Sequence, residues 1–223
     1  GNYSCGAACI FWWHVFCGFS KPSDAPQQKK ILHIFIYWIL HWFIDACSGF
    51  KFSMESDKIY NYIKIAQRIE KELGCKIHIV GGYVRDKILK LSSVDLDFVV
   101  EGDGLQVAKL FCEKLGGKLT IYKKFLTASL KLEDGFVIDV ATSRKEKYPK
   151  PASMPVVEPA KLESDLLRRD FTINALALPL HASRFTLHDT IDVCGGLNDI
   201  KNKIIRVIHR RSFVDDPTRM MRA

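Results

Sequence analysis

A strand-like run that stops at two glycines and leads into a helix is the feature that most restricts the fold of this chain. Residues 76–80, KIHIV, have the length and β-branched content of a buried strand. Gly81 and Gly82 end that run, and a helix is expected to begin near Val84. Because glycine has no side chain, backbone N–H groups at such a helix start can approach a phosphate closely. The turn is therefore a candidate phosphate site, although a simple turn remains the alternative.

Two aspartates interrupt the next apolar run, VDLDFVV at residues 94–100. Residues two apart in a strand face the same way, so Asp95, Asp97 and Val99 share one face, and the alternate residues from Leu96 onward face the core. The two carboxylates would stand roughly 7 Å apart. Like charges at this range raise one pKa unless a cation lies between them, and carboxylate oxygens suit Mg²⁺. A solvated strand edge is the alternative.

The glycine turn and the aspartate pair lie close together in the sequence. Arg85 falls in the first turn of the expected helix, where a guanidinium can bind a triphosphate oxygen. A metal-binding pair beside a phosphate site indicates phosphoryl or nucleotidyl transfer, because that chemistry consists mainly of positioning and charge neutralisation.

The rest of the chain alternates helical patterns with short strands. Residues 56–73 predict a helix with Ser56 as its cap and Gly74 as its stop. Further expected elements are a helix at 105–117, strands at 118–122, 127–132 and 136–141, a Pro-rich basic loop at 145–159, a helical stretch at 162–178 and a strand at 203–208. Local hairpins mixed with helices predict an α/β (α+β) fold with a mixed, mostly antiparallel sheet flanked by helices.

The hydrophobic N-terminal segment, residues 1–53, differs in kind from the rest of the chain. Its apolar run at residues 31–50 is shorter than the roughly 20 residues that span a bilayer. A poor membrane anchor, an interfacial helix, or upstream sequence before a start at Met54 all remain open. The cluster of Cys5, Cys9, His14 and Cys17 matches no standard zinc spacing, so loose or packed thiols are expected there.

Charge and cysteine content indicate the partner and the compartment. The formal net charge of +8 favours a polyanionic partner such as nucleic acid. Seven cysteines without the tight even framework of a small secreted domain indicate reduced thiols and a cytoplasmic protein.

Four motifs in series carry a resemblance to a known family. They are GGYVRDKIL from Gly81, DLDFVVEGDG from Asp95, RRDFTINALAL from Arg168 and SFVDDPTRMMRA from Ser212. In this order they resemble the head domain of the class II tRNA nucleotidyltransferases and bacterial poly(A) polymerases, the CCA-adding enzyme family. The resemblance covers about residues 58–223. It implies a nucleotidyltransferase head domain at residues 54–208 and the start of a helical neck at 209–223.

The resemblance also implies residue roles. Asp95 and Asp97 match the family's catalytic metal pair, with Mg²⁺ as the cofactor. The positions that match its nucleotide site are Gly82, Arg85, Arg169, Asp216, Arg219 and Arg222. Asp170 and Asn174 would shape the site around the sugar and the helix. The spacing of three residues places Asp216 and both following arginines on one helical face, in agreement with a joint role.

Two further groups have open interpretations. Asp139, which alternates with Val137 on a strand face, is either a third carboxylate beside the metal pair or a strand-end residue that binds the basic loop. Lys123, Lys124 and Thr127 belong either to a mobile loop that closes over substrate, as the family implies, or to a solvated hairpin.

Two polar clusters are expected to lie outside the site. His188, Asp189 and Asp192 belong to a segment that resembles a structural turn and strand, where Asp192 or Asp199 caps neighbouring backbone. His209 and the two residues after it, Arg210 and Arg211, are expected to form charged surface, with RNA phosphate contact as the alternative.

The resemblance implies a function: template-independent addition of CMP and AMP, from CTP and ATP, to the 3′ end of tRNA. Addition of poly(A), of CC or of A alone remains open, as does a non-catalytic nucleotide- or RNA-binding fragment. The family's base-reading motif, an acidic pair followed by an arginine on a neck helix, has no counterpart in these residues. The helical body and tail are also missing, so the chain alone is expected to lose most RNA binding, and whether it is active alone remains open.

Overall fold

The computed structural model describes residues 58–93, 95–180 and 187–223, all within the compact unit Glu55–Ala223. The expectations about Ser56 and about the hydrophobic N-terminal segment lie outside these residues. Within the described ranges, no helix is long and apolar enough to cross a membrane.

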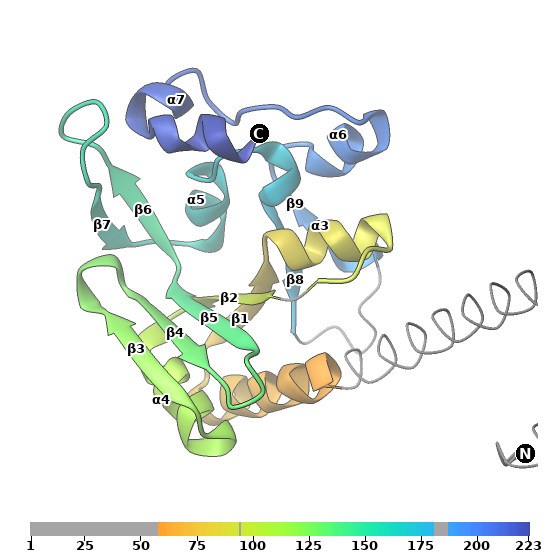
Figure 1. Ribbon diagram of the computed structural model, residues 1–223, viewed down its shortest axis with the longest axis vertical. Helices are drawn as coiled ribbons and strands as arrows, with labels where there is room; N and C mark the ends of the chain where they lie inside the picture. The colour runs from red at the N-terminus through yellow and green to blue at the C-terminus, as the bar shows by residue number, and fades with distance from the viewer. Residues whose placement is uncertain (1–57, 94, 181–186) are drawn as a thin grey trace, which may run out of the picture. The chain divides into compact units, whose positions relative to one another are not determined.

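A seven-stranded mixed sheet organises the described residues, with the strand order β3-β4-β5-β2-β1-β8-β9 (Figure 1). Its strands are β1 (Lys76–Val80), β2 (Asp95–Glu101), β3 (Lys118–Tyr122), β4 (Thr127–Lys131), β5 (Val137–Thr142), β8 (Leu176–Pro179) and β9 (Ile191–Asp192). Among the described strands of this sheet, β2 and β5 pair in parallel and the other neighbours pair antiparallel. The predicted mixed, mostly antiparallel fold is confirmed.

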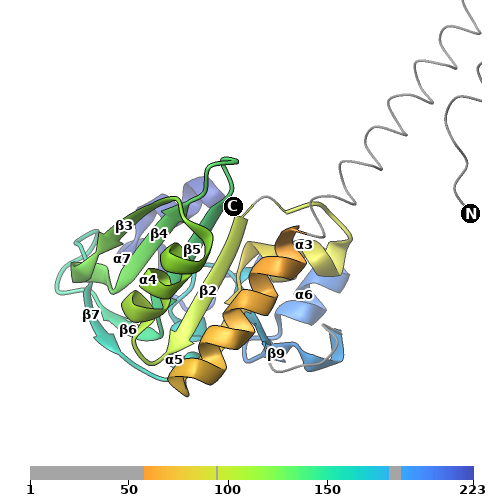
Figure 2. The ribbon, with the colours of Figure 1, turned by 90° about the horizontal axis from the view of Figure 1, so that it is seen from below.

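One face of the sheet is covered by two amphipathic helices, residues 58–73 and α4 (Gly104–Leu115) (Figure 2). The first buries Ile59, Tyr62, Ile63, Ala66 and Ile69 in the core and ends at Gly74, whose φ is +62°. The second begins at Asp103, whose side chain accepts from the N–H groups of the first turn. Phe98 and Phe111 stack between strand and helix with ring centroids 5.3 Å apart.

The opposite face carries α5 (Leu162–Leu167), which packs on the central strand β2. Val99 is buried there against Leu162 and Leu166, whereas Leu96 and Phe98 belong to the larger core on the other face. The period of two predicted for VDLDFVV is therefore confirmed from Asp95 onward. As a result, Asp97 lies on the face that α5 covers.

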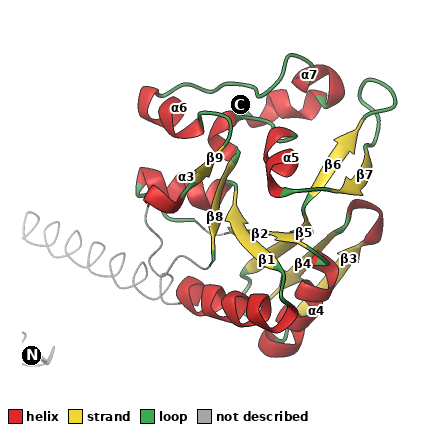
Figure 3. Ribbon diagram, turned by 180° about the vertical axis from the view of Figure 1, so that it is seen from behind, coloured by secondary structure: helices red, strands yellow, loops and turns green. Residues whose placement is uncertain are grey.

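Three expected elements were wrong. Residues 145–159 are not a loop throughout, because β6 (Arg144–Lys147) and β7 (Val156–Pro159) form an antiparallel pair outside the main sheet, and only residues 148–155 between them are a loop (Figure 3). The helical stretch at 162–178 breaks into α5, the 3₁₀ helix η2 (Thr172–Asn174) and the buried strand β8. Residues 203–208 do not form the expected strand, apart from one bridge between Val207 and Phe171.

The remaining helices of the described ranges have at most eight residues each. They are α3 (Gly82–Leu89), the 3₁₀ helix η1 (Lys123–Phe125), η3 (Leu187–Asp189), α6 (Gly196–Asn202), α7 (Ser212–Asp215) and η4 (Pro217–Arg222). Asp192 stabilises the start of α6 by accepting from the backbone N–H groups of Cys194, Gly196 and Leu197. The structural role expected for Asp192 is thus confirmed.

Candidate active site

The parallel pairing of β2 with β5 brings carboxylates from distant parts of the chain together. Asp97 is in register with Asp139, so the two side chains lie side by side on the face that α5 covers. Both line a cavity of about 1040 Å³, together with Arg169. Asp95 occupies the exposed start of β2. This arrangement favours the interpretation of Asp139 as a third carboxylate over a contact with the basic loop.

Asp97 is held in an unfavourable environment for a negative charge. Burial raises the pKa of Asp97 to about 6, the Arg169 guanidinium opposes this rise, and the charges of Asp139 and Asp95 add to it. A cation bound among these carboxylates would remove that penalty. Perturbed carboxyl groups of this kind are typical of functional sites.

The donor set fits a hard divalent cation. Carboxylate oxygens from Asp95, Asp97 and Asp139 are the ligands that Mg²⁺ prefers, usually one or two of them with substrate phosphates completing the shell. In residues 58–93, 95–180 and 187–223, no group of three acidic, His or Cys side chains is tight enough to hold a metal by itself.

The glycine turn lies close to the Asp97 carboxylate at Gly81, whereas Gly82 faces Arg85. A Cβ on Gly81 would stand 3.2 Å from Asp97 Oδ2 and 3.2 Å from Arg169 Nη1. The φ of Gly81 is +73°, a conformation that L-residues rarely adopt. Gly82 begins α3, as a phosphate-binding turn requires, and a Cβ on Gly82 would meet Arg85 Nη2 first, at 3.7 Å.

Five of the predicted residues form one hydrogen-bonded chain, although they come from distant parts of the sequence. Arg85 Nη1 donates to Asn174 Oδ1 at 2.7 Å, and Asn174 Nδ2 donates to Asp170 Oδ1 at 3.1 Å. Arg222 Nε donates to Asp170 Oδ2 at 3.0 Å, and its Nη2 donates to Asp216 Oδ2 at 3.3 Å. These hydrogen bonds connect α3, which follows the glycine turn, to η4, so the sequence motifs converge on one region.

The surroundings of Asp170 favour its ionised form. Burial would raise the pKa of Asp170, but hydrogen bonds from Asn174, from the Phe171 N–H and from Arg222 outweigh burial and lower it. The carboxylate is therefore an acceptor that orders Asn174 and Arg222 on two sides.

The two remaining arginines of the prediction differ in what they contact. Arg169 lines the cavity near Asp97 and pairs with Asp165 at 3.3 Å. Arg219 is only 4% exposed, and it donates to the carbonyls of Arg168 at 2.9 Å and Arg169 at 3.2 Å and to Ser212 Oγ at 2.8 Å. Arg219 therefore fastens the backbone that carries Arg169, a role that the spacing alone did not indicate.

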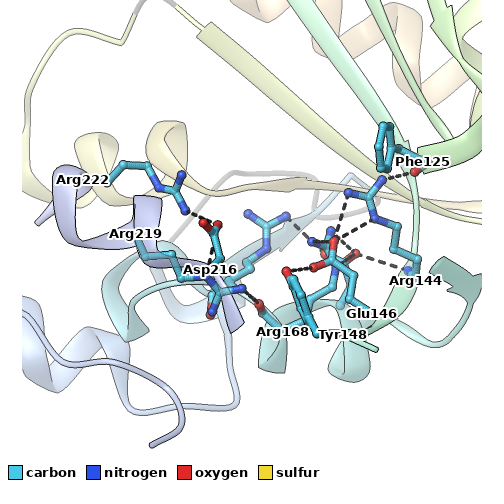
Figure 4. Close-up of polar contacts among 10 residues, drawn as sticks. Phe125, Arg144, Glu146, Tyr148, Arg168, Asp216, Arg219 and Arg222 are labelled. Atoms are coloured by element: carbon cyan, nitrogen blue, oxygen red, sulfur yellow. Dashed lines mark hydrogen bonds and ion pairs between the residues drawn. The ribbon is translucent and has the colours of Figure 1, made fainter. Parts of the chain in front are cut away.

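A polar cluster that the sequence did not predict completes the cavity wall. Glu146, Tyr148 and Arg168 line the same cavity, and Arg144 joins them through Glu146 (Figure 4). Their signal was hidden because residues 145–159 were interpreted as a loop. Asp165 could have indicated this cluster from the sequence, because it lies three residues before Arg168 and four before Arg169, the spacing of side chains that meet on a helix.

The other polar clusters contain structural contacts. Asp199 accepts from Thr172 Oγ1 at 2.7 Å and pairs with Arg206 at 2.9 Å, so it stabilises the packing of η2. Arg211 pairs with Asp215 one helical turn away at 3.4 Å. Lys123 and Lys124 lie in η1, which ends at Phe125 and is followed by Leu126 with a positive φ of +53°.

Comparisons with known proteins agree with this geometry. The chain matches the model of the poly(A) polymerase head domain over residues 77–206. It is 44% identical over 157 residues to an A-adding tRNA nucleotidyltransferase of Geobacter sulfurreducens, covering 70% of this chain and 18% of that protein. It is 38% identical over 148 residues to a CC-adding tRNA nucleotidyltransferase of Deinococcus radiodurans, covering 66% of this chain and 39% of the relative.

A solved structure gives the same result. The CCA-adding enzyme of Thermotoga maritima, in complex with tRNA, superposes with a TM-score of 0.59 at 40% identity, over 74% of this chain and 36% of that enzyme. The chain thus spans well under half the length of these relatives. The predicted family is confirmed: the chain belongs to the poly(A) polymerase head domain family of nucleotidyltransferases.

Proposed function

We propose that this chain is the catalytic head of an enzyme that adds CMP or AMP, from CTP or ATP, to the 3′ end of tRNA. The observation that carries the proposal is the placement of Asp97 and Asp139 in register on parallel strands, beside Arg169 in one cavity. Metal-assisted nucleotidyl transfer requires two or three carboxylates that face a cavity, and arginine side chains in the cavity wall neutralise phosphate charge. The names of the relatives direct the proposal to tRNA, and a tRNA substrate is compatible with the cytoplasmic location expected from the cysteine content.

The reaction is a displacement at phosphorus without a covalent enzyme intermediate. The oxygen of the RNA 3′-hydroxyl forms a bond to the α-phosphorus, the bond to the β-phosphate bridge breaks, pyrophosphate leaves and the hydroxyl proton passes to solvent. Asp95 and Asp97, with Asp139 beside them, would hold Mg²⁺. When bound, Mg²⁺ would neutralise phosphate charge and favour the ionised hydroxyl.

Residues around the carboxylates would bind the nucleotide. Gly81 and Gly82 leave the start of α3 open to the triphosphate, where N–H groups and the helix dipole favour negative charge. Arg169 would neutralise charge near the α-phosphate. Asp170 and Asn174, ordered by their mutual hydrogen bond of 3.1 Å, would orient the sugar.

The base added is a separate question. Relatives are named A-adding, CC-adding and CCA-adding, and the cavity residues do not distinguish these specificities. Poly(A) addition stands beside them as an alternative. In the family, base choice is expected to depend on a neck motif that has no counterpart in this chain.

Incorporation of labelled nucleotide tests the proposal. Labelled CTP or ATP is supplied with Mg²⁺ and a tRNA transcript that lacks its last three nucleotides, to this chain and to the chain continued through the reading frame after Ala223. We expect incorporation that Asp97→Ala abolishes and the surface variant Glu133→Gln retains. Unchanged incorporation in Asp97→Ala would refute the mechanism. Mg²⁺-dependent nucleotide binding without turnover in every form would instead identify a binding module.

A further inference from the structure

Glu146, on β6, is a buried carboxylate in the cavity wall, and its side chain is only 7% exposed. Its Oε1 accepts from Arg144 Nη2 at 3.2 Å and from Arg168 Nη1 at 2.8 Å, while its Oε2 accepts from the Tyr148 hydroxyl at 2.8 Å (Figure 4). Without these donors, a buried carboxylate would lower the free energy of unfolding, and two adjacent guanidinium groups without the carboxylate would do the same. The contacts therefore depend on one another.

One arm of this cluster reaches the turn between β3 and β4. Arg144 Nη1 donates to the backbone carbonyl of Phe125, the last residue of η1, as Figure 4 shows. Leu126 follows with a φ of +53°, and its N–H donates to Lys123 O at 3.2 Å. The residues on either side of this turn line the cavity: Tyr122 and Thr127.

The other arm reaches the arginine pair. Arg168 Nη2 donates to Asp165 Oδ1 at 2.7 Å, and Arg169 Nη2 donates to the second oxygen of the same carboxylate at 3.3 Å. Asp165 is fully buried and also accepts from the backbone N–H of Arg144 at 3.3 Å, so its position is set by these three partners and by α5. A displacement of Arg168 would therefore be passed through Asp165 to Arg169.

Both arms meet at Oε1 of Glu146, so one atom connects two parts of the cavity wall that are distant in the sequence. We propose that Glu146 is a positioning residue, which fixes the turn Lys123–Phe125 and the pair Arg168 and Arg169 relative to each other. It acts through Arg144 and Arg168 and not on the reacting atoms. Its consequence for catalysis rests on the proposed function.

Hydrogen exchange of single amides tests the positioning without any activity. In Glu146→Gln, we expect the amides of Leu126 and Arg169 to exchange about tenfold faster, because a hydrogen-bonded charge has been removed. Amides of β2 should keep their wild-type rates. The matched control is Glu158→Gln on the same hairpin, whose carboxylate is 44% exposed and pairs with Lys145 and Lys147. It should leave both amides unchanged.

Two results would overturn the proposal: wild-type exchange at Leu126 and Arg169, or an equal acceleration throughout β2, which would indicate general destabilisation. A second variant covers the case in which Glu146→Gln does not fold. Arg144→Met removes the arm to Phe125 and leaves the bond between Arg168 and Glu146. It should accelerate exchange at Leu126 alone, and an equal response at both amides, or none, would contradict the two-arm arrangement.

Kinetics separates this inference from the proposed function. In the incorporation assay, Glu146→Gln should raise the KM for nucleotide about tenfold and change kcat less, because the nucleotide-contacting groups are misplaced rather than removed. Glu158→Gln should match the wild type. Accelerated exchange with an unchanged KM would refute the catalytic consequence of the positioning. If the wild type incorporates nothing, the proposed function fails, and the exchange experiment alone decides the role of Glu146.

Discussion

Substitution of Asp97 by Asn should stabilise the metal-free protein at neutral pH. The pKa of Asp97 is raised from 3.8 to about 6 by burial and by neighbouring carboxylates. The folded state therefore binds more protons than the unfolded state between these two values, so stability falls as the pH rises through this window. Well above pH 6, the full free-energy cost of the buried negative charge on Asp97 is present, and a neutral amide of the same shape removes that cost.

The size of the effect follows from the same values. The pKa differs by about 2 between the two states, and each pKa unit is worth 1.36 kcal/mol, which gives an upper limit of about 3 kcal/mol. For a domain of this size, each kcal/mol shifts the Tm by roughly 2–4 °C. Asp97→Asn should therefore raise the Tm by up to about 10 °C at pH 7.5 in EDTA, with little change near pH 4.

Calorimetry with a pH series and with added Mg²⁺ measures this prediction. Mg²⁺ should raise the Tm of the wild type, because a ligand that binds only the folded state stabilises it, and it should have much less effect on Asp97→Asn. Glu133→Gln, on the exposed turn after β4, is the matched control and should leave the Tm unchanged. A lower Tm for Asp97→Asn at pH 7.5 in EDTA would refute the reasoning.

Three further predictions concern the surroundings of the site. Gly81→Ala should abolish incorporation and lower the Tm, since the new Cβ meets Asp97 and Arg169 at 3.2 Å and φ is +73°; normal activity in this variant would contradict the close approach. Arg222→Ala breaks a half-exposed ion pair with Asp170, so denaturation should show a loss of at most about 1 kcal/mol while the KM for nucleotide rises; an unchanged KM would remove Arg222 from the site. Phe111→Ala should cost about 3–5 kcal/mol in urea unfolding, and a loss below about 1 kcal/mol would show that α4 is not packed as described.

Local patterns were sufficient for the elements near the aspartate pair. The strand KIHIV, the alternation in β2 and the glycine stop of α4 follow from periodicity and turn chemistry, which need no tertiary information. Residues 162–178 were misjudged because Leu176–Pro179 lies between two other strands and is buried on both faces, so its apolar residues continue a helix-like pattern. The pair β6 and β7 was missed because its strands are short, charged and separated by prolines.

The site was only partly predictable for a related reason. Asp95 and Asp97 share one strand, so the period of two was enough to place them together. The proximity of Asp139 depends on the parallel register of β2 with β5, which one sequence does not specify. Glu146 was harder to predict, since Arg144 lies beside it only because residues 144–147 form a strand, and Arg168 comes from a separate element that only the tertiary structure brings to the same carboxylate.

The central claim is that carboxylates from two neighbouring strands together support nucleotidyl transfer, and Asp139 tests it most directly. The measurement is the rate of CMP and AMP incorporation into a tRNA transcript lacking its 3′ end, by the wild type and by Asp139→Asn, each with its Mg²⁺ dependence. The account predicts a fall of about a hundredfold or more and a weaker Mg²⁺ response in Asp139→Asn. Incorporation at the wild-type rate and Mg²⁺ dependence would contradict it.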